Sequence, residues 1–229
     1  MKMLLTLLAL LVAGTAHAAS IVVRPTMLIL PAGESTAAIT VTNNGSQPVN
    51  AQVRVFGWDQ AQNEDQLQPT QALAASPPMT AILPGQSQTV RLVRVDKTPA
   101  TREESYRLLV DEITDRASTQ HTGVAIQLRY SVPVFVVPDT RATATLAVKA
   151  ELDGGQVLID ARNSGQSHAR ISNVALQYAD GTSQVIGEGL VGYVLPGKDR
   201  QWRLPLPAHK APPRQVKAEV NEQALLVDL

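Results

Sequence analysis

Residues 123–138 read GVAIQLRYSVPVFVVP. Every second side chain in this stretch is apolar: Val124, Ile126, Leu128, Tyr130, Val132, Val134 and Val136. Because successive side chains of a β-strand point to opposite faces, the pattern predicts one strand with one apolar face. At roughly 3.3 Å per residue such a strand extends about 43 Å, more than twice the common strand length. The stretch therefore predicts an all-β fold whose last strand is unusually long.

The same stretch is predicted to lie at the edge of a sheet. Pro133 has no N–H to donate to a neighbouring strand, which favours an edge position. The intervening positions carry Gln127, Arg129 and Ser131. A long, regular, apolar edge strand is an aggregation hazard that folded proteins avoid. A protein that retains one is expected to pair it with another chain by β-augmentation.

The first eighteen residues have the pattern of a secretory signal peptide. Lys2 supplies a positive end, residues 3–14 are apolar but too short to span a bilayer comfortably, and Ala16-His17-Ala18 places small residues at the cleavage positions. We expect residues 1–18 to be removed on export. No later segment approaches eighteen uninterrupted apolar residues, so we expect a mature chain that is not embedded in a membrane.

Composition excludes several partners and stabilising devices. Without Lys2 the chain has 19 basic and 20 acidic side chains, a net charge near −1. Nucleic acid is not an expected partner, because that binding needs a basic surface to neutralise phosphates. Cysteine is absent, which excludes disulfides and thiolate metal sites. Stability must come from apolar cores, and about 210 residues are enough for two of modest size.

The first half of the mature chain is predicted to form an immunoglobulin-like sandwich. Apolar alternation interrupted by turn signals gives seven strands, and the polar stretch 60–71 is predicted to be a loop. The expected strands are 21–30, 37–42, 49–58, 80–83, 89–95, 106–113 and 124–137. The absence of cysteine rules out an antibody-type domain.

A second all-β pattern follows a short linker at 138–141. Its expected strands are 142–150, 157–161, 169–178, 184–188, 200–206, 215–220 and 224–228. About 90 residues suffice for a smaller immunoglobulin-like sandwich. We therefore predict a signal peptide at 1–18, a first domain at 19–138 and a second at 139–229, with no evident sequence repeat between them.

No motif supports catalysis or a cofactor. Gly187-x-Gly189-x-x-Gly192 matches a dinucleotide fingerprint, but that motif needs a following helix and β-like sequence surrounds it here. The histidines left after export are widely separated, and no nucleophile elbow is present. We expect no catalytic residue, no metal and no cofactor, and interpret Asn44-Gly45 as a turn rather than part of a glycosylation site.

Several stretches form a recognisable pattern in their order along the chain. In the first half they are ITVTN (39–43), PGQSQTVRLVR (84–94), ESYRLLVDEI (104–113) and RYSVPVF (129–135). In the second half they are residues 163–173 and 189–197. Together they resemble the periplasmic pilus-assembly chaperones of PapD type, and the last two first-half stretches are most similar to the archaic chaperone–usher branch. The resemblance covers essentially the whole mature chain.

This resemblance implies a fold and a function. Chaperones of this family have two immunoglobulin-like domains set at an angle, like a boomerang, and complete the fold of pilus or fimbrial subunits by donor-strand complementation. It implies a periplasmic location, subunits and an outer-membrane usher as partners, and possible capping of the free edge by dimerisation. Aligned with the family's donor strand, the side chains expected to enter the subunit are Val124, Ile126, Leu128 and Tyr130.

The expected anchor for the subunit's C-terminal carboxylate departs from the family. The two positions that carry basic residues in better-known members hold Met27 and Pro133 here. Because arginine offers a planar fork suited to a carboxylate, the candidates are Arg107 first, then Arg129 and Arg94. Solvated or internally paired arginines remain the alternative for each. By the same resemblance, two further residues are expected to be structural and interdomain: Arg91 and Glu103.

A fibre subunit or adhesin of immunoglobulin-like fold is the alternative function. Such a subunit should lack one strand and carry a free N-terminal donor extension. This chain has a full strand count in its first half, and its first strand begins within about three residues of the expected mature terminus. An enzyme is not expected.

Overall fold

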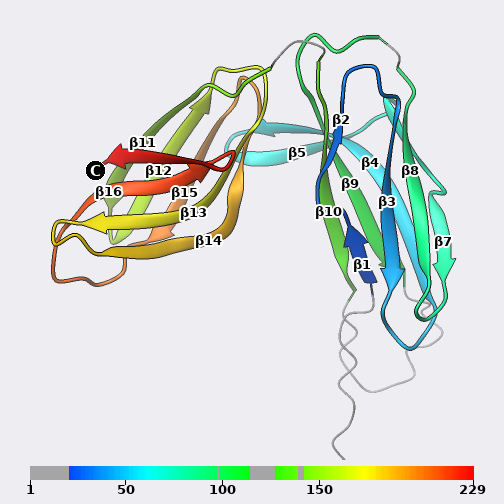
Figure 1. The fold of residues 1–229 in the computed structure, drawn as a ribbon, viewed down its shortest axis with the longest axis horizontal. Helices are drawn as coiled ribbons and strands as arrows, with labels where there is room; N and C mark the ends of the chain where they lie inside the picture. Colours follow the sequence, from blue (N-terminus) through cyan, green and yellow to red (C-terminus); the bar gives the residue numbers. More distant parts are fainter. Residues whose placement is uncertain (1–20, 97, 114–126, 139–141) are drawn as a thin grey trace, which may run out of the picture.

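The computed structural model describes residues 21–96, 98–113, 127–138 and 142–229. Their regular elements are all strands, arranged as two β-sandwiches set at an angle to each other (Figure 1). This confirms the predicted all-β, two-sandwich fold. The predicted signal peptide lies outside the described residues, so it stays a prediction, as do the domain boundaries.

The first sandwich packs two sheets around one apolar core. One sheet has the order β1-β3-β8-β6, and the other has the order β2-β10-β9-β4-β5, with β7 also paired to β4. The core is formed by fully buried side chains from both sheets, among them Leu30, Val41, Val90, Leu108 and Val134. The strands are β1 (Ile21–Arg24), β2 (Leu28–Leu30), β3 (Thr36–Asn43), β4 (Val49–Ala61), β5 (Glu64–Pro69), β6 (Leu73–Ser76), β7 (Met79–Ile82), β8 (Ser87–Arg94), β9 (Glu104–Ile113) and β10 (Arg129–Val136).

The second sandwich is smaller. Its sheets have the orders β11-β12-β15 and β14-β13-β16-β17. They enclose a core that includes Val157, Ile171, Leu176 and Val216. The strands are β11 (Leu146–Asp153), β12 (Gln156–Asn163), β13 (Ala169–Tyr178), β14 (Ser183–Val194), β15 (Asp199–Pro205), β16 (Pro213–Val220) and β17 (Gln223–Asp228).

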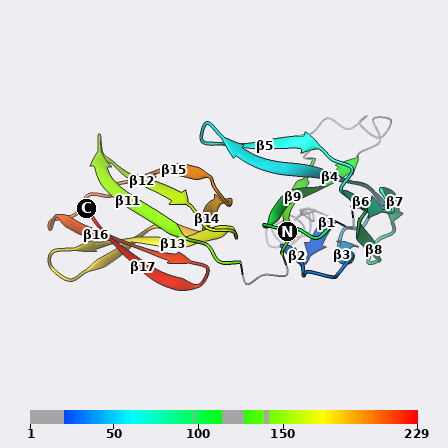
Figure 2. The ribbon, with the colours of Figure 1, turned by 90° about the horizontal axis from the view of Figure 1, so that it is seen from above.

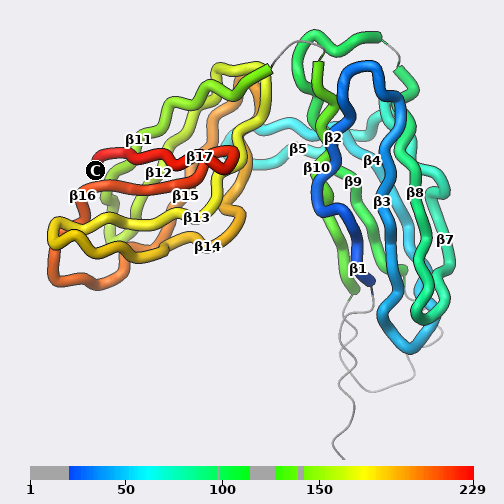
Figure 3. The backbone as a smooth tube through the Cα atoms, viewed as in Figure 1, coloured from blue at the N-terminus to red at the C-terminus, as the bar shows by residue number. Residues whose placement is uncertain are grey.

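Three secondary-structure predictions in the first half are wrong, one of them because residues 73–76, where no strand was expected, form β6. Residues 21–30, predicted as one strand, form β1 and β2 in different sheets; Pro25 between them cannot donate to a ladder. The predicted loop 60–71 is largely strand, since β4 runs to Ala61 and β5 follows after Gln62 and Asn63, both at positive φ. This hairpin reaches toward the second sandwich (Figures 2 and 3), so it lacks the one-sided apolar pattern that marks a core strand.

Each sandwich contains the same type of turn around a buried asparagine, although no repeat was evident from the sequence. The amide of Asn43 is fully buried; its Nδ2 donates to the carbonyls of Gln47 and Ile82, and its Oδ1 accepts from the N–H of Gly45. Asn163 repeats the arrangement in the second sandwich. Its partners are Ser167, Val194 and Gly165. Each asparagine thereby closes a turn whose backbone would otherwise lack partners.

Candidate functional site

The candidate site centres on the outer edge of β10. Its antiparallel register with β9 pairs Arg129 with Asp111 and Pro133 with Arg107, and the carbonyl of Leu128 accepts a hydrogen bond from the N–H of Glu112. In such a ladder the even-numbered residues of β10 turn their backbone groups toward β9, and the odd-numbered ones turn theirs outward. Pro133 therefore sits where its missing N–H removes no bond to β9.

On the outward side, β2 covers only part of β10. The parallel pairing joins Val134–Val136 to Leu28–Leu30. The prediction of an edge strand is therefore wrong for the end of β10. It holds for Arg129–Pro133, which has no strand beside it on that side among the residues that the structure describes. This short segment offers outward N–H and C=O groups to a further strand.

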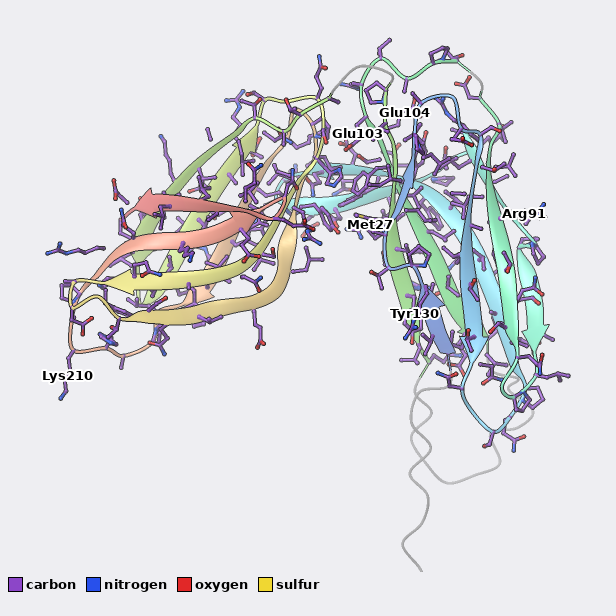
Figure 4. The ribbon with its side chains drawn as sticks, viewed as in Figure 1. Met27, Arg91, Glu103, Glu104, Tyr130 and Lys210 are labelled. Carbon is purple, nitrogen blue, oxygen red and sulfur yellow. The ribbon has the colours of Figure 1, made fainter. Side chains whose placement is uncertain are left out.

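The even-numbered side chains of β10 lie on the core side of the sheet. Val132, Val134 and Val136 are buried in the first core. Tyr130 (Figure 4) is half-buried against the same core. Its hydroxyl donates to the carbonyl of Ile21. Leu128, at the start of the described segment, is half-buried. The other two predicted donor residues, Val124 and Ile126, lie outside the described residues.

The odd-numbered face of β10 builds the junction between the sandwiches. Phe135 is fully buried and stacks on the imidazole of His168, with ring centroids 3.6 Å apart. It also packs against Trp58 and Tyr193, at 5.9 Å in each case. Met27, at one of the positions where the family was expected to carry a cation, packs against this cluster (Figure 4).

Glu103 lies at the same junction. Its side chain is fully buried and accepts hydrogen bonds from the Ser167 hydroxyl at 3.1 Å and from the His168 N–H at 2.9 Å, while His168 Nδ1 lies 2.9 Å from Oε2. A buried carboxylate is stable only with such partners. The expectation for Arg91 is wrong: it is exposed on β8, away from the second sandwich (Figure 4). The alternation of β8 turns its side chain to solvent.

The β4–β5 hairpin forms further hydrogen bonds with the second sandwich. The side chain of Gln60 bonds the carbonyl of Tyr193 and the N–H of Leu195, each at 3.0 Å. At the turn, the side chain of Asn63 bonds both backbone groups of Gln201. Residues from a stretch predicted to be a loop therefore help to fix the angle between the sandwiches.

Arg107 lies directly across from Pro133, on the face that meets the second sandwich. Its guanidinium carbon is 3.6 Å from the centroid of the Trp58 ring, and Nη2 is 3.3 Å from Oδ2 of Asp65. The pKa of Arg107 is lowered, because the effect of burial outweighs the opposing effect of the nearby Asp65 carboxylate. Asp65 is shared with Arg200 of β15, at 3.5 Å. Sequence reasoning missed Asp65 and Arg200, because only the hairpin brings them to Arg107.

The other two candidate anchors lie elsewhere. Arg129 is largely exposed and pairs with Asp111, which also accepts from Arg54 at 2.6 Å. Burial opposes ionisation of Asp111, but its hydrogen bonds with Arg129 and Arg54 dominate and lower its pKa. Arg94 is nearly buried and pairs with Glu104 at 3.1 Å. The three candidates therefore do not converge on one site, and Arg107 alone contacts the junction cluster.

Two features are absent from the described part of the chain. No group of three histidine or acidic side chains there is placed to hold a metal ion. No helix in those residues has the length and apolar character needed to cross a membrane.

Comparison with known proteins identifies one family. Residues 20–142 match the pili and flagellar-assembly chaperones, in the PapD N-terminal domain. A search of curated protein sequences finds no significant match.

Solved structures share the fold across nearly the whole chain. A chain in the CsuC–CsuE chaperone–tip adhesion subunit pre-assembly complex, from archaic chaperone–usher Csu pili of Acinetobacter baumannii, matches with a TM-score of 0.66 and 24% identity over 92% of this chain and 98% of that one. A chain in the Salmonella enterica SafA pilin–SafB chaperone complex matches at 0.65 and 16%, covering 93% and 97%. The Pseudomonas aeruginosa CupB2 chaperone matches at 0.60 and 18%, covering 91% and 100%.

Proposed function

From the premise that this chain belongs to the PapD-type family of pilus-assembly chaperones, we propose that it binds pilus or fimbrial subunits in the periplasm by donor-strand complementation and delivers them to an outer-membrane usher. The observation that carries the proposal is the open edge of β10: on the side away from β9, Arg129–Pro133 has no strand beside it among the described residues. The strand of a subunit that aligned there would gain main-chain hydrogen bonds, as β-augmentation requires.

The donor side chains are Val124, Ile126 and Leu128, followed by Tyr130 at the boundary. Tyr130 packs on the chaperone's own core and bonds Ile21, so the part of the stretch before it is the part lent to the subunit. Each aliphatic side chain contributes about 1.5–3 kcal/mol if fully buried. Association and ordering costs are subtracted from that gain.

The alternative, a fibre subunit or adhesin, makes a different prediction for the purified protein. We expect this chain to stay monomeric or to form a dimer, because pairing of two free β10 edges closes both. Size-exclusion chromatography with light scattering measures the mass, and co-expression with a pilus subunit that the chain binds should shift it to a one-to-one complex. Higher polymers of the chain alone would instead favour a fibre subunit.

Arg107 is the proposed anchor for the subunit's C-terminal carboxylate. It lies opposite Pro133, the position where the family was expected to carry a cation, and its guanidinium is held against Trp58. We expect Arg107→Ala to weaken subunit binding by about ten- to hundredfold, the range of one charge-assisted hydrogen-bonded contact. Titration calorimetry of the purified proteins measures this change.

Arg107→Lys is the matched control for that experiment. Lysine keeps the charge but lacks the planar fork that binds a carboxylate with two parallel bonds, so we expect an intermediate affinity. If alanine and lysine variants both bind as tightly as the unmodified protein, Arg107 is not the anchor.

A further inference from the structure

Two arginines share one carboxylate where the sandwiches meet. Asp65 of β5 lies 3.3 Å from Arg107 of β9 and 3.5 Å from Arg200 of β15. The two arginine side chains are 14% and 18% exposed, whereas that of Asp65 is 38% exposed. The carboxylate is thus the most accessible member of the triad, and both of its ionic contacts are long.

The triad has more donor capacity than Asp65 uses. Nε of Arg200 is buried without a hydrogen-bond partner, and its Nη1 lies 3.5 Å from Oδ1 of Asp65 without forming a hydrogen bond. Asp65 accepts from Arg107 through a single nitrogen. A guanidinium has five N–H donors and prefers a bidentate carboxylate. Two positive charges against one negative charge therefore leave a binding capacity for a second carboxylate.

A nearly buried cation cannot be left without a counter-charge. Removing a guanidinium from water is costly unless a partner compensates it. If Arg107 serves a subunit's carboxylate, another acceptor must compensate it in the free chaperone. Asp65 fills that place, and Gln60 steadies it through a 3.2 Å hydrogen bond to its Oδ1.

We propose that Asp65 is an internal stand-in for the subunit's carboxylate: it pairs with Arg107 in the free chaperone and yields Arg107 when the subunit binds. Arg200 keeps Asp65 neutralised after the exchange, and the Trp58 ring holds the guanidinium in place throughout. This inference rests on the proposed anchoring role of Arg107. In this proposal the Asp65 carboxylate competes with the subunit's carboxylate for Arg107.

The test removes the competitor and varies the ligand. The probe is a synthetic peptide of the last twelve residues of a pilus subunit that the chain binds on co-expression, prepared as the free acid and as the C-terminal amide. We expect Asp65→Asn to bind the free acid about fivefold more tightly than the unmodified protein, the effect of losing one partly exposed ion pair. The amide should show no change.

Two further variants complete the design. Asp59→Asn is the matched control, because Asp59 pairs with Lys198 at 2.6 Å and does not contact Arg107. The affinity of the Asp59→Asn variant for both peptides should equal that of the unmodified protein. Arg200→Gln should weaken binding of the free acid, since Asp65 then depends on Arg107 alone. Thermal melting of each variant reports whether it is folded.

The outcomes separate this inference from the proposed function. If the unmodified protein prefers the acid to the amide but Asp65→Asn shows no gain, Asp65 is not a stand-in and the anchor survives. An equal gain for the amide would also overturn the inference, because a carboxylate is then not what competes. If the unmodified protein shows no preference for the acid, the anchor itself fails.

Discussion

Leu128→Asp is expected to abolish recovery of the subunit in a periplasmic pull-down. In the proposed complex Leu128 enters the subunit's apolar groove, so the change removes about 1.5–3 kcal/mol of apolar burial and places an unpaired charge there. The combined loss should weaken binding by at least about a hundredfold. Because Leu128 is only half-buried in the free protein and precedes β10, the chaperone itself should still fold.

Leu226→Asp is the control for this experiment. Leu226 is 57% exposed on β17 of the second sandwich, so the same substitution there should leave recovery of the subunit unchanged. Both variants should accumulate in the periplasm at the level of the unmodified protein. Equal recovery of the subunit with Leu128→Asp and with the unmodified protein would rule out the donor-strand assignment.

The sequence predicted the core-facing side of β10 well, because burial on one face imposes a period of two. Val132, Val134 and Val136 follow that period and are buried. It did not predict where the edge ends, because the pairing with Leu28–Leu30 depends on a strand about a hundred residues earlier in the chain. Local alternation determines which face of a strand is buried, whereas the strands that pair with it depend on the tertiary fold.

The interdomain junction was harder to predict for the same reason. Phe135 lies outside the alternating apolar set that predicted the core face of the strand, yet it is fully buried in a cluster that includes residues of the second sandwich. Asp65 belongs to a polar stretch whose lack of apolar alternation indicated a loop. Its role becomes visible only when the hairpin places it between Arg107 and Arg200. Polar contacts between distant segments leave no periodic signal.

The junction also links the donor strand to the angle between the sandwiches, and Phe135→Ala tests that link. Phe135 is flanked in β10 by Val134 and Val136, which face the first core, while its own ring contacts Trp58, His168 and Tyr193. Truncating a fully buried phenylalanine typically costs about 3–5 kcal/mol of unfolding free energy. Denaturant unfolding followed by circular dichroism measures that loss.

The matched control is Phe56→Ala, the other phenylalanine of the chain. Phe56 is half-buried on β4 and contacts Arg54 rather than the junction cluster, so its removal should cost less than half as much. Only Phe135→Ala should also increase the maximum dimension in small-angle X-ray scattering, because the aromatic cluster that joins the sandwiches is lost. Equal losses for the two variants with unchanged scattering would show that the polar ties of Glu103 and the β4–β5 hairpin hold the angle alone.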